Sequence, residues 1–257
     1  MGLSRYLCFL PLALFFCTTG CLNNERSSSA RDARDAEHRA LSMIRASEGR
    51  LAPVYAPLAE QIATDFDLEQ KEGIGIDLGS GPGTLILGLC ERTQLHWINA
   101  DVNPYFFPYF FKRAAQSGFG GRVSAVFADA CQLPFRNNYA DIIVSRGSFH
   151  FWQDLTQAFS EIYRVLKPGG VAYIGRGFSR TLPAETAREI RTGGRLKYDV
   201  DKTANNLCRI MDVLNIAEYR IHRPKPPGAE DVNYGVWIEF HKPKGRVACI
   251  PKLDHQQ

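Results

Sequence analysis

The sequence predicts an α/β domain with a doubly wound, seven-stranded sheet, mostly parallel with an antiparallel last strand. First, the apolar run 74–78 is followed by a glycine-rich turn and the helix-forming segment 84–90, an order typical of doubly wound folds. Second, further strand-like runs alternate with helical ones, as a parallel sheet requires. Third, two further strand-like runs near the end of the chain are joined by a proline-rich turn. The predicted strands are 74–78, 96–100, 123–127, 140–145, 171–174, 219–222 and 234–241.

Length and composition indicate one globular domain with appendages. The 257 residues are 45% hydrophobic and 23% charged, which is ordinary for a soluble protein. The net charge of +4 is too small to indicate a nucleic-acid partner, and none is expected. The seven cysteines show neither a C-x-x-C pair nor metal-ligand spacing, so we expect independent thiols and no metal site.

The first 21 residues differ from the rest of the chain. Arg5 precedes the apolar run 6–16, which is too short to span a bilayer but has the length of a signal-peptide core. Thr18-Thr19-Gly20-Cys21 then resembles the end of a bacterial lipoprotein signal, although Thr18 stands where leucine is usual. The resemblance implies a signal at 1–21 with Cys21 as the lipid-anchored first residue of the mature chain. We interpret residues 22–39 as a polar linker.

Several helices are predicted from local pattern. Residues 40–66 are expected to form one or two amphipathic helices, broken near Pro53 and Pro57. The aromatic run 105–111 predicts a bulky core helix kinked at Pro108, with a hydrophobic ledge or membrane-facing surface as the alternative. The tail, 242–257, is basic and carries no motif.

The turn after the first strand carries the chemistry. It reads Asp77-Leu78-Gly79-Ser80-Gly81-Pro82-Gly83, and its glycines let a ligand approach main-chain amides. A dinucleotide fingerprint requires its third glycine at position 84, which is Thr84 here. The carboxylate of Asp77 would repel a pyrophosphate and attract a cation. S-adenosyl-L-methionine (SAM) carries an ammonium and a sulfonium but no phosphate, so the loop suits SAM better than NAD.

An acidic residue follows the second strand at the spacing expected of a ribose-binding residue. Asp101 lies 22 residues beyond Gly79 (101 − 79), close to the offset of about 20 in nucleotide-binding folds. A carboxylate accepts hydrogen bonds from two vicinal hydroxyls at once. Asn103, in the same loop, is expected to assist. The alternative role for Asp101 is a helix N-cap.

Ordered motifs over about 55–178 resemble the class I SAM-dependent methyltransferases, especially the branch that methylates quinone precursors and other small molecules. The loop 76–83 resembles the family's first motif, Asp101 its ribose-binding acid, Asp129-Ala130 the pair beside adenine, and 166–170 the turn before the fifth strand. The resemblance implies a Rossmann-like fold and SAM as the cofactor. The implied cofactor-binding residues are Tyr55, Asp77, Gly79, Ser80, Gly81, Gly83, Asp101, Val102, Asn103, Asp129, Ala130 and Ser145.

The sequence defines the acceptor side less well. His150 is the candidate catalytic base, since an unperturbed imidazole titrates near pH 7; a loop histidine that orders the pocket is the alternative. Tyr55 either contacts the cofactor or packs as an aromatic on the covering helix. Arg176 and Arg180 either pair with an acidic substrate or stay solvated. Residues 181–218 are expected to form the substrate cover.

The predicted function is methyl transfer from SAM to a small-molecule acceptor. Two alternatives stay open: a nicotinamide-dependent oxidoreductase on a similar sheet, and a lipoprotein that keeps the fold as a binding scaffold. Because SAM is made in the cytoplasm, an exported enzyme would lack its cofactor. The chain is therefore either a membrane-anchored lipoprotein that meets SAM by an unknown route or a cytoplasmic enzyme translated from Met43.

Overall fold

The computed structural model describes residues 19–191 and 199–245, with only the backbone described for residues 19–30. Most of the predicted signal, 1–21, lies outside the described residues, as does most of the basic tail, 242–257. Within the described ranges, no helix is both long and apolar enough to cross a membrane.

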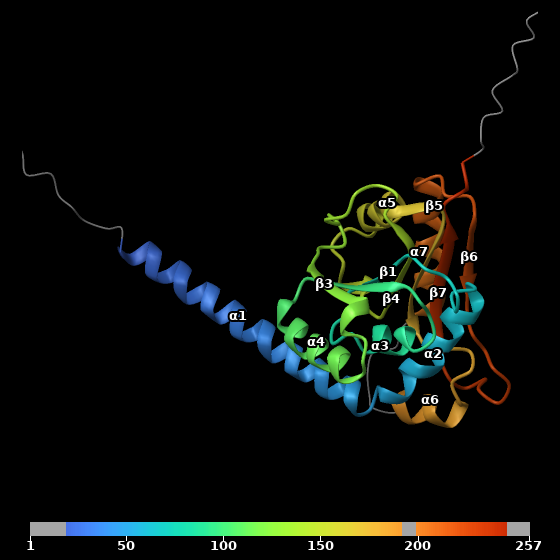
Figure 1. Cartoon of the computed structure of the whole chain (residues 1–257), viewed down its shortest axis with the longest axis horizontal. Helices are drawn as coiled ribbons and strands as arrows, with labels where there is room; N and C mark the ends of the chain where they lie inside the picture. The colour runs from blue at the N-terminus through green and yellow to red at the C-terminus, as the bar shows by residue number, and fades with distance from the viewer. Residues whose placement is uncertain (1–18, 192–198, 246–257) are drawn as a thin grey trace, which may run out of the picture.

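A seven-stranded sheet with the order β3-β2-β1-β4-β5-β7-β6 forms the centre of the molecule (Figure 1). Neighbouring strands pair in parallel except for β7, which runs antiparallel to both β5 and β6. This topology confirms the predicted doubly wound fold with an antiparallel last strand. The strands are β1 (Ile74–Leu78), β2 (His96–Asp101), β3 (Val123–Phe127), β4 (Ala140–Arg146), β5 (Leu166–Gly177), β6 (Tyr219–His222) and β7 (Gly235–His241).

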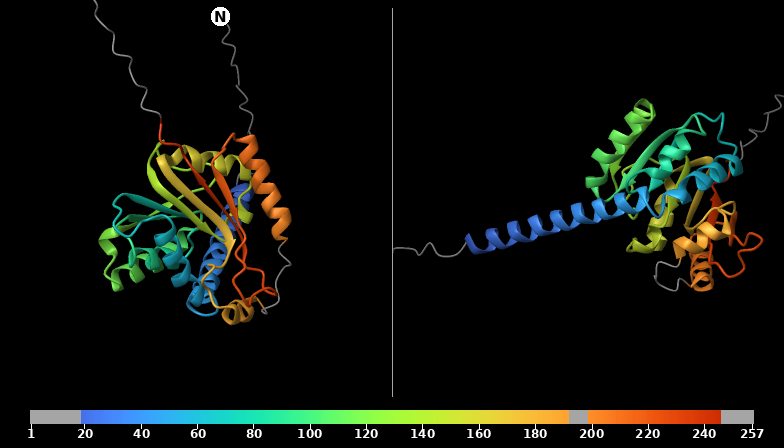
Figure 2. Two further views of the ribbon diagram at one scale, coloured as in Figure 1. Left: turned by 90° about the vertical axis from the view of Figure 1, so that its right-hand side faces the viewer. Right: turned by 90° about the horizontal axis from the view of Figure 1, so that it is seen from below.

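Helices cover both faces of the sheet (Figure 2). Side chains of α2, α3 and α4 pack with Ile142 and Val144 on one face, whereas α5 and α7 pack with Ile143 on the other. Burial on both faces explains the apolar run 142–144 in the middle of β4. The helices are α1 (Thr19–Glu48), α2 (Ala52–Asp65), α3 (Thr84–Cys90), α4 (Phe107–Gln116), α5 (Leu155–Val165), α6 (Ala184–Arg191) and α7 (Val200–Val213), with short 3₁₀ turns η1 (Pro104–Phe106), η2 (Gly120–Arg122) and η3 (Phe149–Phe151).

Helix α1 extends away from the domain at its N-terminal end (Figures 1 and 2). Its C-terminal part contacts the domain, where Ala40 and Ile44 pack against Phe106. The Asn103 side-chain amide also donates to the Ala36 carbonyl at 2.8 Å. The predicted polar linker, 22–39, is therefore part of a continuous helix, since neither glycine nor proline interrupts the segment from residue 22 to residue 48.

Two of the three prolines expected to disturb helices stand at helix starts. Pro53 lies in the first turn of α2 and Pro108 in the first turn of α4. Backbone N–H groups in the first turn have no partner within the helix, so a proline there costs no helical hydrogen bond. The predicted kink at Pro108 is therefore wrong. Pro57 lies inside α2 without ending it, so the predicted break there is also wrong. The chain breaks instead at 49–51, between α1 and α2.

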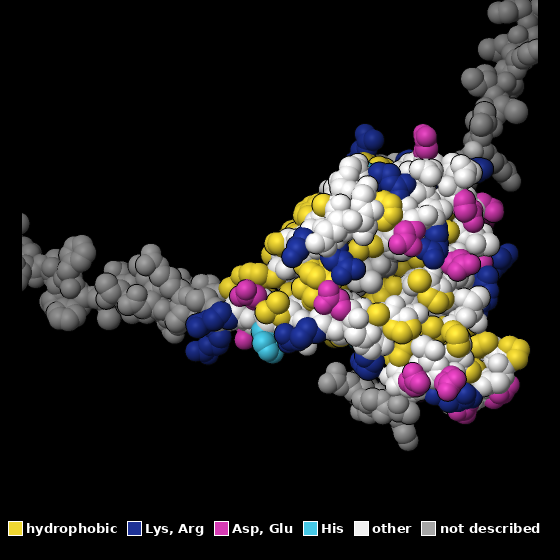
Figure 3. All heavy atoms as spheres, turned by 60° about the horizontal axis from the view of Figure 1, so that its bottom comes forward, with side chains coloured by type: hydrophobic (Ala, Val, Ile, Leu, Met, Phe, Trp, Pro, Cys, Tyr) yellow, Lys and Arg dark blue, Asp and Glu magenta, His cyan; other side chains and the backbone are white. Residues whose placement is uncertain are grey.

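The aromatic run 105–111 is only partly a core element. Phe106 and Phe110 are buried, whereas Tyr105 and Phe111 are 40% and 44% exposed. On the face drawn in Figure 3, hydrophobic side chains are interspersed with Lys, Arg, Asp and Glu. One helix face cannot hide six adjacent rings, which is why the run divides between core and surface.

The segment 181–218 divides into two parts. In α7, Leu207 and Met211 pack into the core beside α5 and the sheet, so one face of this helix is part of the core. Its apolar residues recur at helical spacing, which is the sequence signal for such packing. In α6, Ala187 and Ile190 pack against Phe178, which follows the carboxyl end of β5. A role in covering the substrate stays a prediction for α6.

Candidate functional site

The loop after β1 is built on three glycines with positive φ, namely +68° at Gly79, +56° at Gly81 and +75° at Gly83. A Cβ at Gly79 would lie 2.3 Å from the Ser148 Cβ, and one at Gly83 would lie 2.1 Å from the Phe110 ring. A Cβ at Gly81 meets nothing closer than 3.8 Å. Packing therefore requires Gly79 and Gly83, whereas a Cβ at Gly81 would only be in ordinary van der Waals contact with Met43 and Phe106.

Asp77 is a buried carboxylate directly beneath this loop. Asp77 is only 2% exposed. The Ser80 hydroxyl donates a hydrogen bond to Oδ2 of Asp77 at 2.6 Å. Burial raises the pKa of Asp77 to about 7, although the Ser80 hydrogen bond lowers it. A nearby cation would favour the ionised form. The site is thus suited to a positively charged group, as the sequence analysis expected.

Asp101 ties the loop to the end of β2. Its Oδ2 accepts a hydrogen bond from the backbone N–H of Gly81 at 2.8 Å, and its Oδ1 accepts one from the backbone N–H of Asn103 at 2.8 Å. Burial raises the pKa of Asp101, and these backbone hydrogen bonds oppose the shift. The N-cap at this position is Asn103, which accepts the Tyr105 amide, so the N-cap alternative for Asp101 is wrong.

Asn99 joins this group although the sequence analysis did not single it out. It lies opposite Asp77 in the β1–β2 register, is fully buried, and donates its amide to the Gly81 carbonyl at 3.0 Å. Its Oδ1 has no hydrogen-bond partner. A buried polar atom left unpaired is costly and rare in folded proteins. The only sequence signal was a polar residue in the middle of an apolar strand.

The remaining predicted cofactor residues lie around the same edge of the sheet. Asp129 accepts the Cys131 amide at 2.9 Å, Ala130 is buried, and Val102 is 58% exposed. Ser145 is buried and shares a 2.6 Å hydrogen bond with Ser148. Ser148 in turn donates to the Leu78 carbonyl at 3.0 Å, which connects the end of β4 to the glycine loop.

Tyr55 contacts a residue that the sequence analysis did not assign. The Arg146 guanidinium lies 5.3 Å from the centre of the Tyr55 ring. Burial raises the pKa of the Tyr55 hydroxyl, and the charge of Arg146 opposes that shift. Tyr55 therefore lies in the site through its contact with Arg146 and not only as a packing aromatic.

His150 lies on the exposed loop after β4. Its ring centre is 3.9 Å from that of Phe151, which is 76% exposed. Partial burial of the ring and the charge of Arg176 lower the pKa of His150 to about 4. The imidazole is therefore neutral at pH 7 and able to accept a proton, although such a low pKa makes it a weak base.

Arg180 is engaged within the protein. Both of its terminal nitrogens bind the Asp65 carboxylate, at 2.5 and 2.6 Å. This bidentate pair argues against the prediction that Arg180 binds an acidic substrate. Among the described residues, no cluster of three or more His, Cys, Asp or Glu side chains is placed to hold a metal ion.

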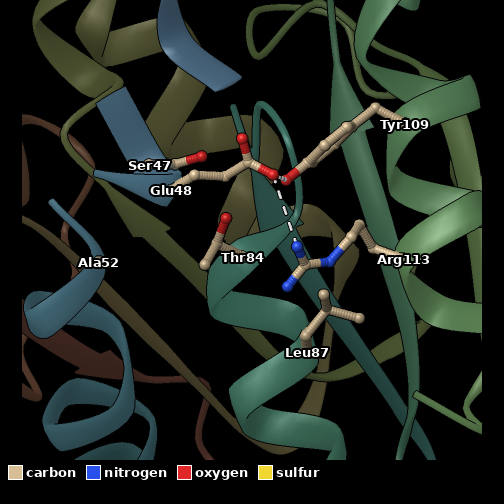
Figure 4. A pocket seen from close by; sticks show the side chains of 7 residues that line it. All are labelled: Ser47, Glu48, Ala52, Thr84, Leu87, Tyr109 and Arg113. Atoms are coloured by element: carbon tan, nitrogen blue, oxygen red, sulfur yellow. Dashed lines mark hydrogen bonds and ion pairs between the residues drawn. The ribbon is translucent and has the colours of Figure 1, made fainter. Parts of the chain in front are cut away.

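A cavity of about 220 Å³ lies beside the loop, between the end of α1 and helices α3 and α4 (Figure 4). It contains none of the predicted site residues. Glu48 of α1 accepts a hydrogen bond from the Tyr109 hydroxyl at 2.6 Å and forms an ion pair with Arg113 at 3.5 Å. These two contacts connect α1 to α4 at the wall of the cavity. Its lining residues are Ser47, Glu48, Ala52, Thr84, Leu87, Tyr109 and Arg113.

Comparison with known proteins agrees with this geometry. Residues 76–174 match the family model described as a methyltransferase domain. The chloroplast 2-methyl-6-phytyl-1,4-hydroquinone methyltransferase of Arabidopsis thaliana is 34% identical over 107 residues, which are 41% of this chain and 30% of that protein. The demethylmenaquinone methyltransferase of Thermus thermophilus is 34% identical over 109 residues, 42% of this chain and 49% of that protein. The chain thus spans less than half the length of these curated relatives.

A solved structure extends the similarity to most of the chain. It is a protein of Methanococcus maripaludis provisionally assigned as a SAM-dependent methyltransferase, with a TM-score of 0.71 and 32% sequence identity. The match covers 82% of this chain and 95% of that one. On this similarity and on the glycine loop with its two buried carboxylates, the chain belongs to the SAM-dependent methyltransferase family.

Proposed function

We propose that this protein transfers the SAM methyl group to a small-molecule acceptor. The observation that carries the proposal is the pair of buried carboxylates, Asp77 and Asp101, which are hydrogen-bonded to the glycine loop through the Ser80 hydroxyl and the Gly81 backbone N–H. One carboxylate suits an ammonium and the other suits vicinal hydroxyls, and both would repel the phosphates of a nicotinamide dinucleotide. This donor set fits SAM and argues against the nicotinamide alternative.

Bound SAM supplies a methyl group already activated by a positive sulfur. Asp77 would hold its methionine end, Asp101 its ribose hydroxyls, and Val102 with Asp129-Ala130 its adenine. The main task of the protein is then to align the acceptor and exclude water, since positioning alone lowers a barrier by several kcal/mol, roughly 7–11 at best. His150 acts as a base only if the acceptor must lose a proton.

For the acceptor we propose an apolar aromatic molecule such as a quinol. Relatives named for hydroquinone and demethylmenaquinone methylation support this class. So does the exposed ring of Phe151 at the carboxyl edge of the sheet, because exposed aromatic groups beside a site favour apolar ligands.

The test is a labelled-methyl transfer assay against a cell metabolite extract, with Gly81→Asp as the inactive control. Label is expected in an organic-soluble product with the wild-type protein only. Parallel titrations with SAM and NADH check the cofactor, and tighter NADH binding would reject the proposal. SAM binding without any labelled product would favour the non-catalytic scaffold.

Localisation is a second proposal, in which translation begins upstream of Met43. Ala40 is 1% exposed in the domain core and the Ala36 carbonyl binds Asn103, so a start at Met43 would remove contacts beside the cofactor loop. Anchoring at Cys21 stays part of this proposal. Mapping of the native N-terminus with cell fractionation decides it, and a mature chain beginning at Met43 would contradict it.

A further inference from the structure

Arg146 lies beside the cofactor loop through strand register, not through a sequence motif. Asp77 is opposite Val144 in the β1–β4 pairing, so their side chains share one face of the sheet. Arg146 is two residues further along β4 and therefore points to the same face. There its guanidinium lies 5.3 Å from the Tyr55 ring centre, and its Nε donates to the Gly177 carbonyl at 3.3 Å.

Opposite charges meet at this position. Burial lowers the pKa of Arg146, the charges of Tyr55 and Asp77 oppose that effect, and the charge of Arg50 adds to it. Arg50 comes from the turn between α1 and α2, where its Nη1 donates to the Ile190 carbonyl at 3.0 Å. Asp77 thus lies near one like charge, that of Asp101, and one opposite charge, that of Arg146, while Arg50 lies near Arg146.

We propose that Arg146 binds the α-carboxylate of the SAM methionine while Asp77 binds its α-ammonium. An α-amino acid group carries these two opposite charges on one carbon, and Asp77 with Arg146 presents their complement on one face of the sheet. Guanidinium–carboxylate pairs are strong and directional, particularly away from bulk water. Tyr55 is then a positioning residue that supports the guanidinium with its ring. The assignment rests on the proposed function.

The test uses two ligands that differ only in this carboxylate, S-adenosyl-L-homocysteine and S-adenosyl-3-thiopropylamine. By titration calorimetry, the wild-type protein is expected to bind the first at least tenfold more tightly. In Arg146→Gln the ratio should fall below threefold, because an amide cannot balance the carboxylate charge. Arg180→Gln is the matched control, since Arg180 is paired with Asp65, and it should keep the wild-type ratio.

Each outcome bears on a different claim. Equal binding of both ligands by the wild-type protein, or an unchanged ratio in Arg146→Gln, overturns the role of Arg146 and leaves the proposed function standing. Absence of S-adenosyl-L-homocysteine binding by the folded wild-type protein overturns both. If Arg146→Gln does not fold, Arg146→Met decides, because it also removes the charge while keeping an unbranched apolar stem. A ratio below threefold in that variant supports the assignment, and an unchanged ratio overturns it.

Discussion

Two halves of the carboxyl edge of the sheet are built differently. In the cofactor half, formed by the ends of β1 and β2 with the loop 79–83, the polar residues Asp77, Asn99 and Asp101 are at most 7% exposed. The other half, which we propose binds the acceptor, is formed by the loop 149–152 with α6, and its Phe151 is 76% exposed. Buried polar groups need defined hydrogen bonds, which fix the first half, whereas exposed rings are available to varied ligands. Cofactor binding should therefore depend on the first half and acceptor choice on the second.

The largest expected effect is on the free energy of unfolding, which should change with pH as Asp77 in the cofactor half titrates. Its folded pKa is about 7, against an unfolded value of about 4. The folded protein therefore holds this proton to higher pH than the unfolded chain does. The free energy of unfolding should fall as the pH rises from about 4 to about 7, by up to ~4 kcal/mol from this group.

Urea unfolding of the wild type and Asp77→Asn at pH 4.5, 6 and 7.5 checks this sign. The variant keeps an oxygen that accepts from Ser80, so the difference between the two proteins isolates the ionisation. Glu239 does not interfere: His222 and His241 lower its pKa to about 2, so its contribution is lost only below about pH 4.5. A difference that is independent of pH would show that Asp77 ionises normally. SAM affinity should rise over the same window, because only the ionised carboxylate attracts the ammonium.

A second contrast lies within the glycine loop. Gly83→Ala would force a Cβ to 2.1 Å from the Phe110 ring at φ +75°, whereas Gly81→Ala has no close neighbour at φ +56°. We expect Gly83→Ala to lose about 3 kcal/mol of unfolding free energy, from left-handed backbone strain and overpacking together. Gly81→Ala should lose about 1–2 kcal/mol from the backbone alone. Chemical denaturation of both variants measures the difference, and equal losses would mean that the Phe110 ring moves aside.

The sequence predicted the strands and the glycine loop of the cofactor half because their signals are local. The strand, the loop 79–83 and Asp101 lie within one continuous stretch of the chain, and chain spacing alone brings them together. Asn99 and Arg146 were not predicted because their roles arise from strand register. Arg146 reaches Asp77 through the pairing of β1 with β4, strands about sixty residues apart in sequence.

The helices show the same limit. The apolar spacing of α7 was visible in the sequence. The sequence does not show against which face of the sheet this helix packs, and its segment was therefore predicted only as a substrate cover. Pro57 lies inside α2 because packing of Leu58 and Ile62 into the core outweighs one missing backbone hydrogen bond. Tertiary packing, not local propensity, decided both cases.

Removing the Asp101 carboxylate tests the cofactor half directly. Asp101→Ala should weaken SAM binding at least tenfold in calorimetry, which is about 1.4 kcal/mol, because the ribose acceptor and the anchor of the Gly81 amide are both lost. Asp199→Ala is the matched control. Asp199 caps α7 by accepting the Lys202 amide at 2.8 Å, so its loss should lower stability by about 1 kcal/mol and leave SAM affinity unchanged. Equal SAM affinities in the two variants would reject the role of Asp101.

The smallest effect on cofactor binding is expected from the acceptor half. His150→Gln should change SAM affinity less than twofold, because His150 is exposed and its ring packs at a tilt of 39° against Phe151. With its pKa lowered to about 4, the imidazole is already neutral at pH 6. Titration of His150 should therefore cause no change in turnover between pH 6 and 8, measured with the acceptor found in the extract assay.

The kinetic constants of His150→Gln decide between the two roles of His150. A fall in kcat with unchanged KM would assign it as the base, whereas a rise in acceptor KM alone would assign it to ordering the pocket. A large loss of SAM affinity would instead break the division between the two halves, since it would join an exposed acceptor loop to the buried carboxylates that bind the cofactor.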